Sequence, residues 1–305
     1  MHVRLWHGVF IDPSSPGGEW TETLIHTFTG GDGSYPYSTP VIGPKGVLFG
    51  TCEYGGAGVG TAYSLTPPSS PGGPWTEATI HNFGAGSDDA YPFAGLTLGP
   101  GGVLYGATAG GGTSLNWGTV YSLTTPASAG GSWTKATLYA FLGPGANDGG
   151  APEAPPILRS GVLYGTTSGG TFYGDYSTAG TAYSLTAPTA PGGEWTESVL
   201  YHFSSESSGN SPYAPLLALP SGVLLGTAPY NFFCSGCGVS GVAFALHPPA
   251  SPGGAWTETV LHTFTGGSDG GNPMGSLVPG GGSVLYGTTT SGGASGGGTA
   301  YSLTF

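Results

Sequence analysis

The chain has 305 residues with 62 Gly and 27 Pro, and Gly and Pro destabilise a helix interior by about 1 and 3 kcal/mol, so long helices are excluded and an all-β chain is predicted. The 37 aromatic residues (7 Trp, 17 Tyr and 13 Phe) supply a core that disordered chains lack. With 4 basic against 16 acidic residues, the net charge of −12 argues against nucleic acid and anionic membranes as partners.

The first 19 residues form an N-terminal extension. No stretch of eighteen apolar residues occurs in the chain, so no membrane span is expected. The N-terminus lacks the long apolar core of a signal peptide, which leaves open a trimmed signal or a protein that is not exported. Residues 3–11 align loosely with the GTAYSLT segments described next, so they are a possible spare strand.

Four segments repeat five times through the rest of the chain, at spacings of roughly 59 residues. Short apolar runs come first in each unit, and GVLYGT-like runs follow at 46, 102, 161, 222 and 283. GTAYSLT-like runs start at 60, 118, 180, 241 and 298. Tryptophan runs such as WTETLIHTF start at Trp20, Trp75, Trp133, Trp195 and Trp256.

Each run has the character of a β-strand. The GVLYGT runs are continuously apolar, which is typical of a strand covered on both faces, whereas the tryptophan runs mix polar and apolar residues. Turn residues rich in Gly, Pro and Ser separate the runs. We therefore predict one domain over residues 1–305, a five-bladed β-propeller of four-stranded antiparallel blades. The Trp20 run is expected to close the ring by pairing with the final run at 298–304.

The three cysteines predict no metal site. Cys234 and Cys237 are close enough in sequence to form a small disulfide loop, while Cys52 is distant from both. A zinc site of four cysteines is impossible with this count. The glycine runs lack the Gly-Lys-Ser/Thr of a phosphate-binding loop, and we expect no cofactor.

Two kinds of loop are expected on one face of the propeller. Mid-unit loops connect the second and third strands of a unit, and unit-joining loops connect its fourth strand to the next unit. Both differ between units, and binding residues concentrate on variable loops of a rigid scaffold. The unit-joining loops carry Asp32, Asp88, Asp148, Ser208 and Asp269, four residues before a proline. An Asp that recurs in this way is expected to hydrogen-bond its own turn rather than to catalyse.

The residue after each of these prolines begins an innermost strand, so it is expected at the mouth of the central channel. These residues are Tyr37, Phe93, Glu153, Tyr213 and Met274. Glu153 is the one carboxylate in the series. It is predicted either to contact a ligand, with a raised pKa, or to remain a solvated side chain.

The mid-unit loops bring aromatic side chains to the same face. The candidate ligand-binding residues there are Tyr54, Trp117, Tyr173, Asp175, Tyr176, Tyr230, Phe232 and Phe233. Flat rings flanked by polar groups suit a sugar or a protein surface. Alternatively, these rings pack on one another and order the long loops.

Three functions are weighed on these features. The first is a binding or scaffold module for a glycan or a surface protein. The second is a hydrolase or lyase acting on polysaccharide, with catalytic carboxylates drawn from Glu53, Glu153, Asp175 and Glu206. A pair of carboxyl groups at a defined separation is the requirement of glycosidase chemistry. The third is a structural subunit of a surface layer or fibre. Whether the protein is an enzyme stays open, with binding preferred.

The units resemble the choice-of-anchor GloVer-containing proteins, which carry the Gloeobacter/Verrucomicrobia repeat. That pattern runs Asp-Gly-x-x-Pro, an apolar strand, Gly-x-Leu-Tyr-Gly-Thr-Thr, a Gly-Gly loop and Gly-Thr-x-Phe/Tyr, and it recurs five times over residues 20–305. The resemblance implies a secreted or surface-anchored propeller and transfers no catalytic residue. The fourth unit departs most, with GVLLGTA, GVAFALH and Ser208 in place of Asp.

Overall fold

The fold is an all-β array of small antiparallel sheets in a computed structural model. The structure describes residues 6–13, 20–84, 89–112, 116–128, 131–169, 179–190, 192–203, 209–229, 240–251 and 253–304. Only three short 3₁₀ turns interrupt the strands among these residues: η1 (Pro44–Gly46), η2 (Pro100–Gly102) and η3 (Pro144–Ala146). No helix in the described ranges has the length and apolar character needed to cross a membrane.

Four complete sheets follow the predicted units, each with its four strands paired in chain order. The first is β3 (Val41–Ile42), β4 (Leu48–Cys52), β5 (Thr61–Thr66) and β6 (Thr76–Asn82). The second is β7 (Thr97–Leu98), β8 (Leu104–Thr108), β9 (Thr119–Thr124) and β10 (Thr134–Ala140). The third is β11 (Ile157–Arg159), β12 (Val162–Thr167), β13 (Thr181–Thr186) and β14 (Thr196–His202). The fourth is β15 (Leu217–Ala218), β16 (Leu224–Ala228), β17 (Val242–His247) and β18 (Thr257–Thr263).

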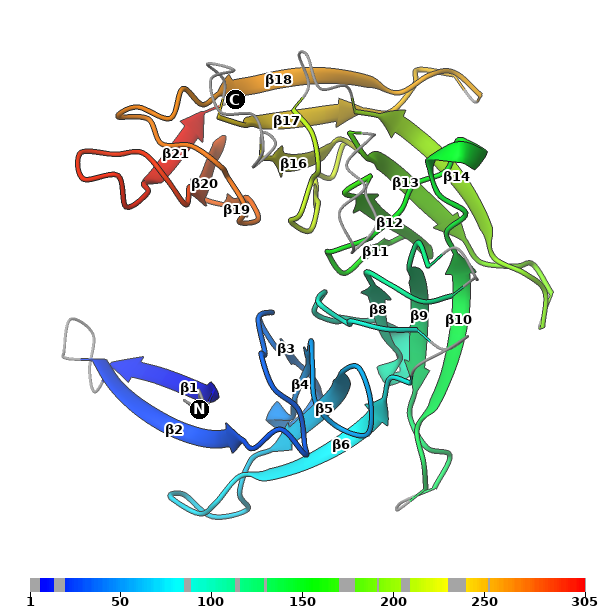
Figure 1. Cartoon of the computed structure of the whole chain (residues 1–305), viewed down its shortest axis with the longest axis vertical. Helices are drawn as coiled ribbons and strands as arrows, with labels where there is room; N and C mark the ends of the chain where they lie inside the picture. The colour runs from blue at the N-terminus through cyan, green and yellow to red at the C-terminus, as the bar shows by residue number, and fades with distance from the viewer. Residues whose placement is uncertain are drawn as a thin grey trace.

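Two smaller sheets stand at the ends of the series. One is a three-stranded sheet of β19 (Val278–Pro279), β20 (Val284–Thr288) and β21 (Ala300–Thr304), and the other is a hairpin of β1 (Trp6–Pro13) and β2 (Trp20–Phe28). The sheets follow one another around a centre, with the short first strands inside and the tryptophan strands outside (Figure 1). This is the arrangement of a β-propeller, in which each sheet packs on the next.

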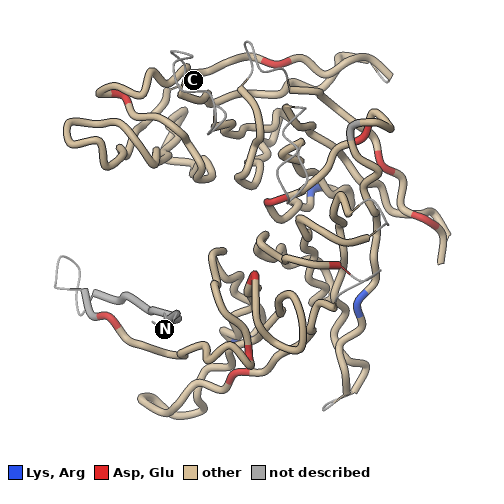
Figure 2. The backbone as a smooth tube through the Cα atoms, viewed as in Figure 1, with Lys and Arg blue, Asp and Glu red and all other residues tan. Residues whose placement is uncertain are grey.

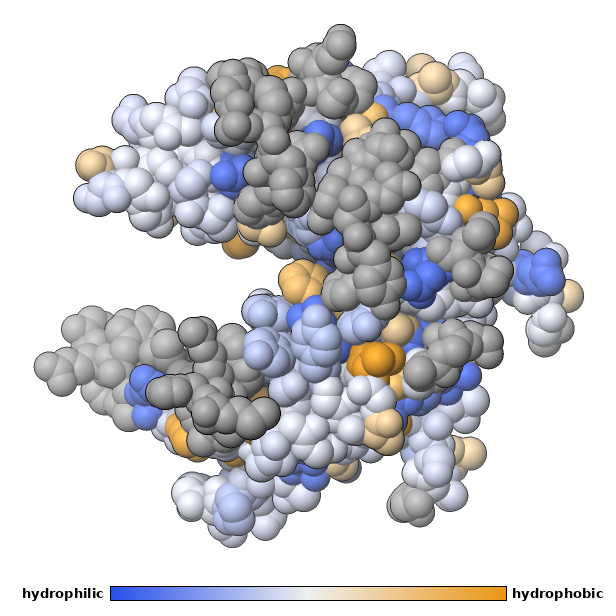
Figure 3. Space-filling view, viewed as in Figure 1, coloured by the Kyte–Doolittle hydropathy of each residue, from blue (hydrophilic) through white to orange (hydrophobic). Residues whose placement is uncertain are grey.

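The predicted closure of the ring is wrong for this structure. β2 pairs along its whole length with β1, from Trp6 opposite Phe28 to Pro13 opposite Trp20, and β21 has β20 as its paired neighbour. The ring is consequently open between the hairpin and the last sheet (Figure 1), and the space-filling view is deeply hollowed on that side (Figure 3). The physical reason is competition for one strand edge, since β1 reaches β2 through a short connection. The spare strand expected in residues 3–11 is thus β1, and it occupies the edge that closure requires.

One phenylalanine per unit joins each sheet to the next. It lies at the end of the tryptophan strand and contacts, at a steep angle, an aromatic ring in the third strand of the following sheet. The ring centroids are 4.8 Å apart for Phe28–Tyr63, 5.1 Å for Phe83–Tyr121, 5.1 Å for Phe141–Tyr183, 5.0 Å for Phe203–Phe244 and 4.9 Å for Phe264–Tyr301. All five Phe side chains are buried. The core of the molecule therefore lies between the sheets, and each pair of successive sheets contains an equivalent aromatic contact.

The same phenylalanines explain a histidine position. His26, His81, Tyr139, Tyr201 and His262 are equivalent, and each ring stacks edge-on against the Phe two residues later in its strand. These rings lie on the outer strands, where the histidines pack against the buried phenylalanines. Within the described part of the chain, no three His, Cys, Asp or Glu side chains gather as ligands for a metal.

In three units, a pair of hydrogen-bonded threonines connects the two strands at the point where the mid-unit loop begins. The Oγ1 atoms are 2.9 Å apart in Thr108–Thr119, Thr167–Thr181 and Thr289–Thr299. In the first unit Cys52 takes the place of the first threonine and interacts with Thr61. In the fourth unit both members are apolar, Ala228 opposite Val242, which avoids leaving one buried hydroxyl without a partner.

Replacing Cys52 with threonine should therefore leave the free energy of unfolding within about 1 kcal/mol of the natural chain. Burial raises the pKa of the Cys52 thiol to about 12, so it behaves as a structural side chain. Cys52→Val is the matched control, because it removes the side-chain partner of the Thr61 hydroxyl, which then keeps only its bond to the Asp32 carbonyl at 3.1 Å, and it should be less stable than Cys52→Thr by about 1 kcal/mol. Urea unfolding of both variants measures this difference, and equal stabilities would contradict the pairing.

Candidate functional site

The mid-unit and unit-joining loops lie on one face, as predicted. Isolated antiparallel bridges connect a residue of each loop kind: Ser34 with Tyr54, Ala90 with Gly110, and Gly271 with Ser291. These bridges fix the two loops of a unit to each other. The variable face is thereby held rigid close to the inner ends of the sheets.

In each unit a strained turn precedes the post-proline residue and places its side chain on the inner side of the sheets. The residue before the proline has a left-handed backbone in all five units, with φ of 59° at Tyr35, 58° at Tyr91, 50° at Ala151, 53° at Ser211 and 53° at Asn272. A non-glycine residue in this conformation is disfavoured by roughly 1–3 kcal/mol and persists where its surroundings impose it. The carbonyls of Tyr35 and Tyr91 also accept hydrogen bonds from the backbone two residues on, at Tyr37 (3.0 Å) and Phe93 (2.8 Å).

The turns bring the five post-proline side chains around one cavity. Tyr37, Phe93, Glu153, Tyr213 and Met274 all line a space of about 430 Å³ at the inner ends of the sheets. The remaining lining comes from their neighbours, including Ser38, Thr39, Pro155, Pro215 and Ser276. None of the lining residues is basic. The volume is in the range of small-molecule sites.

Aromatic rings form a continuous wall on one side of this cavity. The Tyr37 and Phe93 ring centroids are 5.3 Å apart with an interplanar angle of 35°, and Tyr35 lies 5.8 Å from Tyr37. Tyr35 contacts Tyr54, which in turn contacts Tyr91. The Tyr37 side chain is 53% exposed although it belongs to this cluster. Sequence reasoning missed Tyr35 and Tyr91, which the repeated Tyr-Pro pair would have indicated.

The charge of Glu53 acts on Glu153 at the channel mouth. Glu153 accepts a hydrogen bond from the Ser168 hydroxyl at 3.2 Å, and its pKa is raised to about 8, first by burial and also by the charge of Glu53. Glu53 is itself buried, and burial raises its pKa despite a hydrogen bond with Tyr54. Because Glu53 follows β4 in the first sheet and Glu153 precedes β11 in the third, the fold brings together carboxyls that are 100 residues apart.

Glu153 should make stability depend on pH. A carboxyl whose folded pKa lies above its unfolded value of 4.5 favours the folded state when protonated, so its contribution is lost as the pH rises from about 4.5 to about 8. The Glu153→Gln variant lacks this ionisation and should be the more stable protein at pH 8.5, while the two proteins are similar at pH 4.5. Urea titrations at both pH values test this. An equal fall with pH in both proteins would show that Glu153 is solvated.

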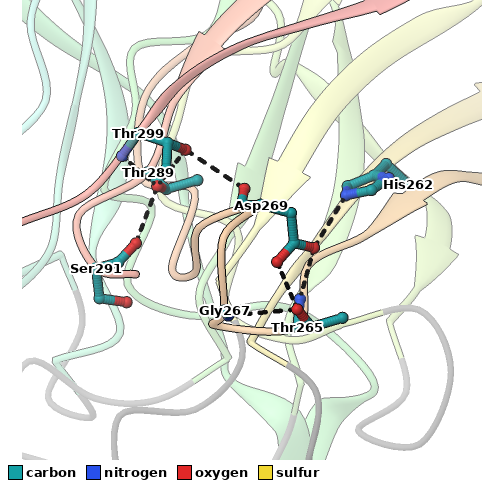
Figure 4. A network of polar contacts seen from close by, with 7 residues as sticks. All are labelled: His262, Thr265, Gly267, Asp269, Thr289, Ser291 and Thr299. Carbon is teal, nitrogen blue, oxygen red and sulfur yellow. Dashed lines mark hydrogen bonds and ion pairs between the residues drawn. The ribbon is translucent and has the colours of Figure 1, made fainter. Parts of the chain in front are cut away.

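The aspartates of the unit-joining loops serve their own turns, as predicted. Asp32 accepts hydrogen bonds from the Thr29 backbone (2.8 Å), and Asp148 from the Leu142 backbone (2.9 Å). Figure 4 shows the equivalent Asp269, which accepts from the Thr265 backbone at 2.9 Å and lies 3.4 Å from the His262 ring. Asp88 and Ser208 lie outside the described residues.

An ion pair in the second unit was not predicted. Asp89 occupies the position of Gly33, Gly149 and Gly270, and Lys135 occupies a position that is Glu in the other four units. The Lys135 Nζ lies 2.7 Å from Asp89 Oδ2, and Asp89 is buried. Comparing the units position by position would have exposed this exchange. The few charged residues are otherwise scattered around the ring (Figure 2).

The other predicted site residues have different places. Tyr54 belongs to the aromatic wall but not to the cavity lining. Trp117 packs against Val120, Phe141 and their neighbours between sheets, and its indole lies over Gly150. Their roles in binding stay predictions. Several candidates lie outside the described residues: Tyr173, Asp175, Tyr176, Glu206, Tyr230, Phe232, Phe233, Cys234 and Cys237.

Four-stranded sheets in a repeated, propeller-like series define the chain as a tandem-repeat β protein. Its sequence matches the Gloeobacter/Verrucomicrobia repeat over residues 7–176 and 58–301, and the chain belongs to that family. No curated protein matches it.

Three solved structures match this chain at low sequence identity. A protein of unknown function from Dyadobacter fermentans DSM 18053 is 15% identical, with a TM-score of 0.44, over 81% of this chain and 72% of that one. An α-L-arabinofuranosidase from Lactobacillus brevis is 13% identical, with a TM-score of 0.40, over 71% and 74%. The Trypanosoma rangeli sialidase in complex with sialic acid is 13% identical, with a TM-score of 0.48, over 97% and 49%.

Proposed function

We propose that this protein is a glycan-binding repeat module that acts outside the cell or at its surface, and that its ligand occupies the cavity at the inner ends of the sheets. The observation that carries this proposal is the convergence of five equivalent side chains, one from each unit, on a single cavity. A rigid scaffold with variable residues at equivalent positions is a common way to build a binding site.

The cavity has the two chemical features that a sugar ring requires. The apolar C–H face of a sugar stacks on flat aromatic rings, and Tyr37 and Phe93 present two such rings side by side. Its hydroxyl groups need hydrogen-bonding partners, which Glu153, Ser38, Thr39 and Ser276 provide in the lining. Because the pKa of Glu153 is about 8, its carboxyl is mostly protonated at pH 7 and both donates and accepts hydrogen bonds.

Calorimetric titration with short oligosaccharides, chosen from a glycan array, tests this proposal. Replacing Tyr37 with alanine should weaken binding at least 10-fold, which corresponds to about 1.4 kcal/mol. Tyr286→Ala is a matched control, because this tyrosine is equally exposed, at 52%, and lies on the last sheet outside the cavity. Unchanged affinity in Tyr37→Ala, or an equal loss in both variants, would refute the cavity as the site.

A second candidate function is cleavage of a polysaccharide. It is favoured by two glutamates, Glu53 and Glu153, whose pKa values are both raised by burial, because a pair of carboxyl groups is the requirement of glycosidase chemistry. The assay is release of new reducing or unsaturated ends from polysaccharides at pH 5 to 8. Activity that disappears in Glu153→Gln would support catalysis, and intact substrate after prolonged incubation would leave binding as the function.

A further inference from the structure

We propose that the cavity prefers sugars carrying a free amino group, so that its ligands belong to the glucosamine type rather than to the neutral sugars. This inference rests on the proposed function, because it concerns the same cavity and specifies the chemistry of its ligand. It follows from the charges around the cavity and from the aromatic wall.

The carboxyls at the channel mouth have no basic side chain in the cavity lining to balance them. Glu153 lines the cavity, and the buried Glu53 lies close enough for its charge to act on Glu153. Ionising Glu153 in this place, next to Glu53 and without a cation, is unfavourable, and an arriving positive charge lowers that cost. A ligand with an ammonium group brings the missing cation.

The described lysines and the described arginine all lie outside the cavity lining. Lys135 is paired with Asp89. Arg159 donates to the backbone carbonyls of Leu219 and Pro220. Lys45 belongs to the η1 turn, which connects β3 to β4 at the ends of these strands that point away from the variable loops. His26 and His262 contact the aspartates of their own turns on the outer strands.

The aromatic wall fits an ammonium group as well as a sugar face. A cation within about 6 Å of a tyrosine or phenylalanine ring is attracted to the ring face, with an added gain where water is excluded. Tyr35, Tyr37 and Phe93 supply such faces next to the cavity. An amino sugar therefore combines stacking, a cation–π contact and an ion pair in one ligand, whereas a neutral sugar uses only the stacking and hydrogen bonds.

The test compares three trisaccharides by calorimetry at pH 6: a glucosamine oligomer, its N-acetylated counterpart and cellotriose. We expect the glucosamine oligomer to bind at least 10-fold more tightly than the two neutral ones. Glu153→Gln should remove this preference, so that the three trisaccharides bind the variant with equal affinity. Glu197→Gln is the control, because burial and Asp148 raise the pKa of Glu197 to about 7 although it lies on outer strand β14.

A second readout is proton release. Among the described residues, the titratable groups near Glu153 and its cavity are Glu53, Tyr35, Tyr37, Tyr54, Tyr91 and Tyr213. An ammonium that ionises Glu153 should release up to one proton, so the measured heat should vary with the ionisation enthalpy of the buffer. Glu153→Gln should abolish this variation.

The outcomes separate the two proposals. Equal affinity for all three trisaccharides, or a preference that persists in Glu153→Gln, would overturn the amino-sugar inference and leave glycan binding in place. Failure of every array glycan to bind would overturn the proposed function itself. A preference for glucosamine that is lost only with Glu153 supports both.

Discussion

Replacing Phe141 with alanine should lower the free energy of unfolding by about 3–5 kcal/mol. Its ring is fully buried between the second and third sheets, where it contacts Tyr183 at 5.1 Å and Tyr139 at 5.2 Å. Alanine would leave a cavity in the buried cluster that Phe141 forms with Val120, Leu163, Tyr183 and Leu185. A chemical denaturation curve gives the loss directly.

The control for Phe141 is its neighbour Leu142, whose side chain is 47% exposed. Leu142→Ala should change the stability by about 0.5 kcal/mol or less, because little apolar surface returns to water. If Phe141→Ala does not fold, Phe141→Leu should show a smaller loss in the same direction. A loss below about 1 kcal/mol for Phe141→Ala would mean that the contact between sheets does not depend on this ring.

Replacing Gly165 with alanine should destabilise the protein by about 3 kcal/mol, a typical upper value for overpacking a core. Gly165 pairs with Tyr183 across the third sheet, and a Cβ atom on Gly165 would lie 2.5 Å from Cζ of that ring. The same glycine recurs in every unit, opposite Tyr63, Tyr121, Phe244 and Tyr301. The tyrosine ring therefore covers the glycine, which secures the register of the two strands.

Gly281 provides the matched control for Gly165. A Cβ atom there meets nothing within 4 Å, and its φ is outside the left-handed region. Gly281→Ala should be neutral within about 0.5 kcal/mol, whereas Gly165→Ala should melt roughly 6–12 °C lower than the natural chain. Equal melting temperatures for the two variants would contradict the close packing of ring on glycine.

Much of this fold was predictable because the sequence repeats. Apolar runs bounded by Gly and Pro recur at nearly constant spacing, and β2 lies at the expected residues Trp20–Phe28. The inward placement of Tyr37 and Glu153 followed from their position after a proline at the start of an inner strand. Each of these features is local, or is an average over five copies of the same pattern.

Features that depend on competition between distant segments were not predictable in the same way. Whether β2 pairs with β1 or β21 depends on the relative free energies of two pairings, and the strand pattern suits both. The coupling of Glu53 to Glu153 depends on the curvature of the whole ring. The Asp89–Lys135 ion pair is different, because both residues depart from the repeat pattern in the same unit and the pair could have been predicted from the sequence.

The most direct test of the proposed binding site is a crystal structure of the protein with a bound glucosamine trisaccharide. We expect one sugar ring stacked on Tyr37 or Phe93, with its amino group within hydrogen-bonding distance of the Glu153 carboxyl. A trisaccharide held on another surface, with the central cavity filled only by water, would contradict it.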